Sequence, residues 1–198
     1  MLIRSKRLDA GVIADRRALL RGVGTLGLSA AAIAVLGGCE SMAASNSASA
    51  ADVEILNVAL GLEHEAINAY QLGAESGLLQ EPVLQVAVLF QSHHKAHRDA
   101  LVTTIQKLGG RPVAEKSMKE YATALNAGSL KNQTDVLQLA ARLEKGAANA
   151  YLGVIPSFND NGLKQVSARL AADETMHWTA LASALGQNLP SKALTFGA

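Results

Sequence analysis

The chain has 198 residues, which is long enough for one domain with a sizeable core. Hydrophobic residues make up 49% of it and aromatic residues 4%, with only four prolines, and this composition favours helices over a sheet. The net charge of +1 is unevenly distributed, because residues 1–38 carry six Lys or Arg against two Asp or Glu, whereas the remainder carries 12 against 15. A nucleic-acid-binding surface needs clustered basic residues, so we expect no nucleic-acid partner.

The beginning of the chain, residues 1–38, has the pattern of a targeting segment. Arg16 and Arg17 precede an apolar run that extends from Val23 to Leu36. This run is too short to cross a bilayer, which takes about 20 residues. The segment resembles a twin-arginine signal peptide, which implies export of a folded protein across a bacterial inner membrane to the periplasm.

The signal-like segment ends in "LGGC", which resembles a lipobox and implies lipid attachment to Cys39 and a membrane anchor. The alternative is simple cleavage at the small residues Ala48 to Ala50. We prefer the lipoprotein interpretation. Cys39 is the single cysteine, so no intrachain disulfide can form. Residues 39–51 are small and polar without periodicity, and they predict a flexible tether.

Four segments with the hydrophobic period of a helix follow the tether: Asp52 to Gly73, Pro82 to Leu108, Asp135 to Gly153 and Leu163 to Leu185. Pro82 suits a first helical turn, Thr134 an N-cap, and Gly186 a helix end. We therefore predict an all-α domain over residues 52–186, followed by a tail over residues 187–198.

The lengths of the connections predict the topology. The first and second helices are joined by about eight residues, as are the third and fourth, and links this short favour antiparallel neighbours. The link from Gly109 to Thr134 is much longer, with a short helix predicted around "EKSMKEYATAL". A link of that length can cross the bundle and bring the third helix in parallel to the second. The predicted fold is two antiparallel hairpins joined by a long crossover.

The two hairpins resemble each other in sequence. "LEHEAINAY", residues 62–70, aligns without a gap with "LEKGAANAY", residues 143–151, and "HKAHRDAL", residues 94–101, aligns with "ETMHWTAL", residues 174–181. An internal repeat of this kind predicts a pseudo-twofold bundle in which equivalent positions face each other across the core.

Each predicted helix has an apolar stripe that is interrupted near its middle by acids or histidines, namely Glu63, His94, His97, Glu144, Glu174 and His177. Ionised carboxylates in a core need cations or hydrogen bonds, because burial disfavours their charge. Iron and manganese accept carboxylate and imidazole ligands, so these residues predict a metal site. The alternatives are a hydrogen-bonded pair for Glu174 and His177, and acids that reach water for Glu63 and Glu144.

This set of residues resembles the ligand pattern of the ferritin-like di-iron proteins over Asp52 to Gly186. In that family the first and third helices each supply a Glu, and the second and fourth each supply Glu-x-x-His. The resemblance implies a ferritin-like four-helix bundle with paired iron, or manganese, used for oxygen or peroxide chemistry or for the oxidation of ferrous ions. Whether the protein is an enzyme stays open.

His94 departs from the family pattern, which has a bridging Glu at this position. A neutral imidazole offers one lone pair and cannot bridge two metals through two oxygens. Three carboxylates also leave two divalent cations with a residual charge of +1. We prefer two ions, and a single ion is the alternative. The competing function is a non-enzymatic bundle lipoprotein with a degenerate, empty or mononuclear site.

Several neighbours of the candidate ligands have expected positions of their own. Tyr70 and Tyr151, at matched places in the repeat, are predicted to fill the core, with hydrogen bonding to the ligating carboxylates as the alternative. We expect His93 to be solvated and His64 to lie on the surface. Asp173 is a candidate acceptor that could orient a ligating histidine, and Asp99 is another.

Overall fold

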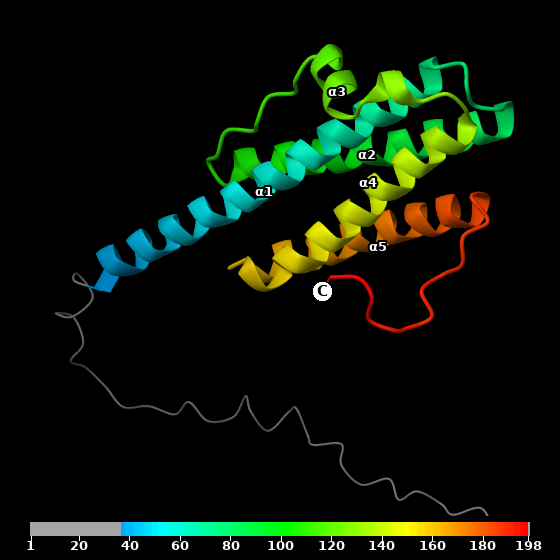
Figure 1. Ribbon diagram of the computed structural model, residues 1–198. Helices are drawn as coiled ribbons and strands as arrows, with labels where there is room; N and C mark the ends of the chain where they lie inside the picture. Colours follow the sequence, from blue (N-terminus) through cyan, green and yellow to red (C-terminus); the bar gives the residue numbers. More distant parts are fainter. Residues whose placement is uncertain (1–36, 198) are drawn as a thin grey trace, which may run out of the picture. The chain divides into compact units, whose positions relative to one another are not determined.

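The structure, a computed structural model, describes residues 37–197 (Figure 1). The four long helices are α1 (Gly37–Glu75), α2 (Glu81–Lys107), α4 (Gln133–Val154) and α5 (Asn161–Ala184). Between them lie the short helix α3 (Met118–Ala124) and the 3-10 turns Ala127–Ser129 and Ile155–Ser157. The part of the chain that the structure describes contains no strand, so the prediction of an all-α fold is confirmed.

The helices form two antiparallel hairpins, as the connection lengths predicted. In Figure 1, α1 and α2 run in opposite directions, as do α4 and α5. The segment that carries α3 returns along the bundle, so that α4 runs in the same direction as α2 (Figure 1). This crossover brings Glu144 of α4 to the level of Glu63 of α1.

Helix α1 begins earlier than the sequence predicted. It was expected to start near Asp52 after a flexible tether, but the helix includes residues 40–51. This stretch is rich in alanine and contains no glycine or proline, so a helix nucleated by the packed part of α1 can extend through it. The predicted signal segment with Arg16 and Arg17 lies outside the described residues, and the side chain of Cys39 is not described either.

The helix ends follow ordinary capping chemistry, with one correction. The side chain of Asn132 accepts a hydrogen bond from Asp135 N at 3.0 Å, so Asn132 caps α4 and the assignment of Thr134 was wrong. Asn is among the strongest N-cap residues because its side-chain oxygen satisfies a free backbone N–H of the first turn. Gly109 and Gly186, at φ 77° and 66°, follow the ends of α2 and α5 in the left-handed conformation that favours glycine.

Two of the apolar clusters of the core lie at different levels of the bundle, and a third joins Tyr121 and Leu125 of the crossover to Ala69 and Leu139. One cluster contains Leu56, Leu60, Leu101, Ile105, Tyr151, Leu163 and Leu170. The other contains Tyr70, Phe90, Leu137, Trp178 and Leu181. Along every long helix the predicted metal ligands fall between the residues of these two clusters. The polar groups are therefore enclosed by apolar side chains on both sides.

The polar face of α1 is covered by the crossover segment. Asn57 Nδ2 donates to Arg111 O at 3.1 Å, and Asn68 Nδ2 donates to Glu115 Oε1 at 2.6 Å. His64, on the same face, is only 6% exposed, so its expected surface position was wrong. The sequence pattern identified a polar face correctly, but it did not show that a distant segment would pack on that face.

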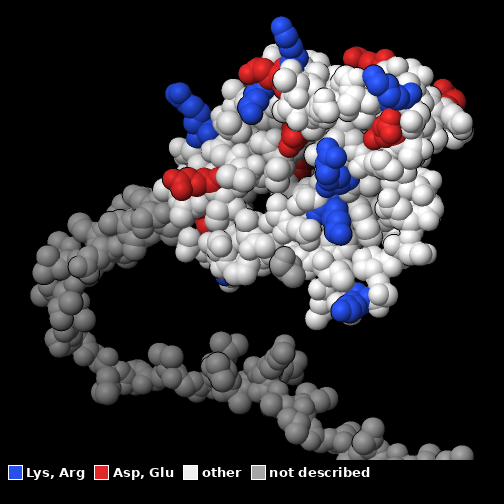
Figure 2. Space-filling view, in the orientation of Figure 1, with Lys and Arg blue, Asp and Glu red and all other residues white. Residues whose placement is uncertain are grey.

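The surface of the bundle has no dominant charge on the side that Figure 2 presents, where Lys and Arg side chains are interspersed with Asp and Glu. Such mixing differs from the clustered basic face typical of nucleic-acid-binding proteins. Within residues 37–197, no helix combines the length and the apolar composition that crossing a membrane requires.

Candidate metal centre

The six predicted ligands converge in the middle of the bundle. Helix α1 contributes Glu63, α2 contributes His94 and His97, α4 contributes Glu144, and α5 contributes Glu174 and His177. All six side chains are buried. The helical period alone places each of them on the inner face of its own helix, and the antiparallel pairing brings the four faces together.

These side chains form two overlapping groups of four. The first group is Glu63, His94, His97 and Glu174, and the second is His94, Glu144, Glu174 and His177. Within each group, one ligand atom per residue lies within 4.8 Å of the others. His94 and Glu174 belong to both groups, and they are aligned positions of the internal repeat.

His94 lies between the acids of α1 and α4. Its Nδ1 is 2.7 Å from Glu63 Oε2, and its Nε2 is 3.2 Å from Glu144 Oε1. The same Nε2 is 3.8 Å from Glu174 Oε2. One imidazole therefore uses both ring nitrogens to connect the two carboxylates that the repeat relates.

Glu174 is the least satisfied residue of the cluster. It is completely buried, yet neither of its carboxylate oxygens has a hydrogen-bond partner. The nearest cationic atoms are His97 Nδ1 and His177 Nδ1, each at 3.3 Å. His97 Nδ1 is likewise buried without a hydrogen bond. Unsatisfied buried polar atoms are costly, and a metal ion in contact with them would remove the cost. With no sulfur donor in the set, the residues fit iron or manganese.

Two tyrosines hold the outer carboxylates, those of Glu63 and Glu144, in place. Tyr70 of α1 donates its hydroxyl hydrogen to Glu144 Oε1 of α4, and Tyr151 of α4 donates to Glu63 Oε1 of α1. Burial and the adjacent carboxylates raise the pKa of both hydroxyls well above the usual value, so both remain donors. The tyrosines thus fill the core, as predicted, and they also make the hydrogen bonds that were considered as the alternative.

The Nε2 atoms of His97 and His177 also have partners. His97 Nε2 is 3.2 Å from Asp173 Oδ2, the arrangement proposed for Asp173 from the sequence. His177 Nε2 is 2.9 Å from His93 Nδ1, so the expectation that His93 is simply solvated was wrong. His93 reaches this partner because α2 and α5 lie beside each other at this level. Asp99 instead pairs with its neighbour Arg98 at 2.9 Å.

Sequence reasoning did not find Phe90 as part of this site. The Phe90 ring stacks on the His177 imidazole, with ring centroids 4.1 Å apart and an interplanar angle of 26°. Phe90 occupies an ordinary apolar position on α2, and its partner lies on another helix. No local signal in the sequence indicates this contact.

The electrostatics of the cluster reflect compensation between acids and imidazoles. Burial acts to lower the pKa of His94, but its hydrogen bonds to Glu144 and Glu63 outweigh burial and raise the pKa to about 11. The pKa of His97 is raised to about 10 against burial, chiefly by the nearby carboxylates of Glu174 and Glu63. Burial raises the pKa of Glu174. For Glu63 and Glu144 burial acts in the same direction, but the histidines outweigh it and keep the pKa of both acids below the usual value.

Metal binding should release protons. Near pH 7 the raised pKa values keep His94 and His97 protonated in the metal-free protein, whereas a ligating imidazole must be neutral. We expect at least two protons per protein to be released, and the affinity for Mn²⁺ to rise by up to about tenfold per proton for each pH unit between about pH 6 and about pH 9. Calorimetric titrations in buffers of different ionisation enthalpy measure the proton count.

The raised histidine pKa values also affect the stability of the metal-free protein, which should fall as the pH rises while the metal affinity increases. Raised histidine pKa values stabilise the folded protein fully below the unfolded value, about 6.5, and this contribution is lost as the pH rises through about 10 to 11. Urea titrations of the metal-free protein should therefore show falling stability above about pH 7. A binding reaction that releases no protons would contradict both expectations.

Removing either tyrosine hydroxyl should weaken the centre. Tyr70→Phe removes the hydrogen bond that the charged carboxylate of buried Glu144 accepts from Tyr70. We therefore expect a loss of about 2 kcal/mol in the free energy of unfolding and about a tenfold weaker affinity for Mn²⁺. Tyr151→Phe should do the same through Glu63. Tyr121→Phe is the control, since the Tyr121 hydroxyl accepts from Lys116 N, away from the cluster, and its loss should leave metal affinity unchanged.

Comparison with known proteins agrees with the arrangement of the helices. A family model described as a ferritin-like domain matches residues 51–187. The crystal structure of a conserved hypothetical protein, rv2844, from Mycobacterium tuberculosis superposes with a TM-score of 0.58 at 19% identity, covering 76% of this chain and 99% of that one. At this identity the similarity concerns the fold. No curated protein gives a significant match.

Proposed function

The chain belongs to the ferritin-like domain family, and from this membership we propose that it binds iron or manganese at its six buried ligands, two ions rather than one. The observation that carries the proposal is Glu174, whose two buried oxygens lack hydrogen bonds and face a histidine on either side. In a protein without a metal function, such a residue would be expected to be apolar or to have partners.

The two overlapping groups provide a place for each ion. Glu63 and His97 would hold one ion, and Glu144 and His177 the other, with His94 and Glu174 within reach of both groups. Bound iron or manganese would supply redox chemistry toward dioxygen or peroxide, including the oxidation of ferrous ions as substrate. The chain's own residues bind the ions, the two tyrosines orient the outer carboxylates, and the apolar clusters limit access of water.

A non-enzymatic bundle with an empty site is the second candidate. Three acids and three histidines balance each other in charge when the histidines are protonated, and His94 already satisfies Glu63 and Glu144. This compensation favours a cluster that is stable without metal. It does not account for the buried oxygens of Glu174, which lack hydrogen bonds.

Metal analysis of protein purified from its native compartment separates the two functions. The proposal expects stoichiometric iron or manganese, and anomalous scattering at the iron and manganese edges should place peaks within the two groups. A protein that purifies without metal and does not take up added Fe²⁺ or Mn²⁺ would exclude the metal function and support the empty bundle.

We further propose that the protein is exported and anchored to the periplasmic side of the membrane through a lipid on Cys39, as the twin arginines and the lipobox-like "LGGC" indicate. Replacing Arg16 and Arg17 together by lysine should retain the protein in the cytoplasm. Cys39→Ser should move it from the membrane fraction to the soluble periplasmic fraction. If the native protein is already soluble in the periplasm, simple cleavage near Ala48 to Ala50 replaces the lipoprotein proposal.

A further inference from the structure

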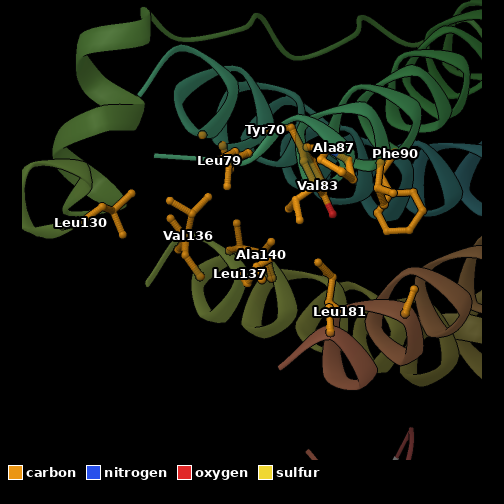
Figure 3. Close-up of a pocket in the computed structure, with 18 residues that line it drawn as sticks. Tyr70, Leu79, Val83, Ala87, Phe90, Leu130, Val136, Leu137, Ala140 and Leu181 are labelled. Atoms are coloured by element: carbon orange, nitrogen blue, oxygen red, sulfur yellow. The ribbon is translucent and has the colours of Figure 1, made fainter. Parts of the chain in front are cut away.

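An apolar pocket lies beside the metal cluster, among α1, α2, α4 and α5. Its volume is about 220 Å³, and Tyr70 has the only polar side chain among its 18 lining residues. Figure 3 shows Leu79, Leu130 and Val136 toward one end of the pocket and Phe90 toward the other. The pocket is therefore formed by side chains from both hairpins and from the crossover.

The Phe90 end of the pocket adjoins the candidate ligands. Tyr70 and Phe90 line the pocket, and each contacts a ligand on its other side. The hydroxyl of Tyr70 donates to Glu144, and the ring of Phe90 stacks on His177 at 4.1 Å between centroids. Only the Tyr70 ring would thus separate a molecule in the pocket from Glu144, and only the Phe90 ring would separate it from His177.

The pocket also reaches the solvent along α2. Pro82 and Val86 line it and are exposed, Val86 to 41%. An exposed valine at the opening presents an apolar surface to an entering molecule. Access along this face does not require the bundle to open.

This pocket is poorly suited to hold water, and leaving it empty would lower the stability of the fold. A buried water needs two to four polar partners, and the hydroxyl hydrogen of Tyr70 is already donated to Glu144. Protein interiors are close-packed, and apolar cavities lower stability when they stay empty. An apolar cavity of about 150 Å³ is sufficient to bind benzene, and the pocket is larger than that.

We propose that this pocket binds an uncharged apolar small molecule, a hydrocarbon ring or chain, with its inner end against Tyr70 and Phe90. A charged group would lose its hydration here without compensation, because none of the lining residues carries a charge. The binding itself requires no metal. Presentation of the molecule to a redox centre rests on the proposed function.

The test uses metal-free protein and n-butylbenzene as the probe, with binding measured by calorimetry and by the shift in unfolding temperature. We expect saturable binding at one molecule per chain. Ala87→Leu on α2 and Ala140→Leu on α4 fill the pocket and should each weaken binding by at least about tenfold. Ala100→Leu is the matched control, because Ala100 lies exposed on α2 and outside the pocket.

Charge selectivity is tested with benzamidine, a cation of similar size, which should bind at least about tenfold more weakly than n-butylbenzene. Absence of saturable binding to the native protein, unchanged affinity in both filled variants, or equal affinity for benzamidine would overturn the proposal. Saturable binding of n-butylbenzene and its comparison with benzamidine are both measured on the native protein, so they test the proposal even if a filled variant does not fold.

Titration of the same filled variants with Mn²⁺ separates the pocket from the metal centre. Because neither Ala87 nor Ala140 contributes a ligand, both variants should keep native metal affinity. Loss of n-butylbenzene binding with metal binding intact confirms the pocket as a separate site. A native protein that binds metal but not n-butylbenzene would refute the pocket and leave the proposed function standing.

Discussion

The variant Glu174→Gln is expected to lose both of the proposed metal ions while keeping the fold. Glu174 belongs to both ligand groups, so its removal affects each ion, and we expect the affinity for Mn²⁺ to fall by more than about 100-fold. The metal-free protein should be at least as stable as the native one near pH 7. Burial raises the pKa of Glu174, which means that holding this carboxylate charged inside the bundle costs stability.

Two measurements on Glu174→Gln distinguish a ligand from a structural residue. Metal stoichiometry by elemental analysis should fall toward zero, and the increase in unfolding temperature on adding Mn²⁺ should disappear. Glu54→Gln makes the same chemical change at an exposed position of α1 and should alter neither quantity. If Glu174→Gln retains both ions, Glu174 is not a ligand and the observation that carries the proposed function is lost.

The variant His94→Glu should bind metal more tightly than the native protein and be less stable without it. The change supplies the fourth carboxylate of the family pattern, so two divalent ions become balanced in charge, and we expect the second ion to bind at least about tenfold more tightly. Without metal, the new acid would lie beside Glu63, Glu144 and Glu174. Since His94 is the positive partner of these acids, we expect a loss of about 3 kcal/mol in the free energy of unfolding.

The control for His94→Glu is His93→Glu on the adjacent residue. It introduces the same carboxylate within reach of His177 but outside both ligand groups. A tighter second ion in His94→Glu alone indicates a bridging ligand, whereas equal tightening in both variants indicates a general effect of charge. If His94→Glu binds the second ion no more tightly than the native protein, the departure at this position does not limit metal binding.

The clustering of the six candidate ligands could be predicted because its signal is local and repeated. Each of Glu63, Glu144 and Glu174 interrupts an apolar stripe, so the helical period marks it as inward-facing from its own neighbours alone. The repeat then relates Glu63 to Glu144 and His94 to Glu174 across the core. The length of the crossover predicts the order of the helices. These properties depend on neighbouring residues and on chain length, which are written in the sequence.

What could not be predicted are the contacts between residues far apart in the chain. The period places Tyr70 and Tyr151 in the core, but their crosswise bonds to Glu144 and Glu63 depend on how far each helix is shifted along its partner. The burial of His64 depends likewise on the path of the crossover. The apolar pocket arises where side chains from four helices fail to fill a common space. Periodicity shows which side of a helix faces inward, whereas the distance, rotation and shift between helices depend on how all the side chains pack together.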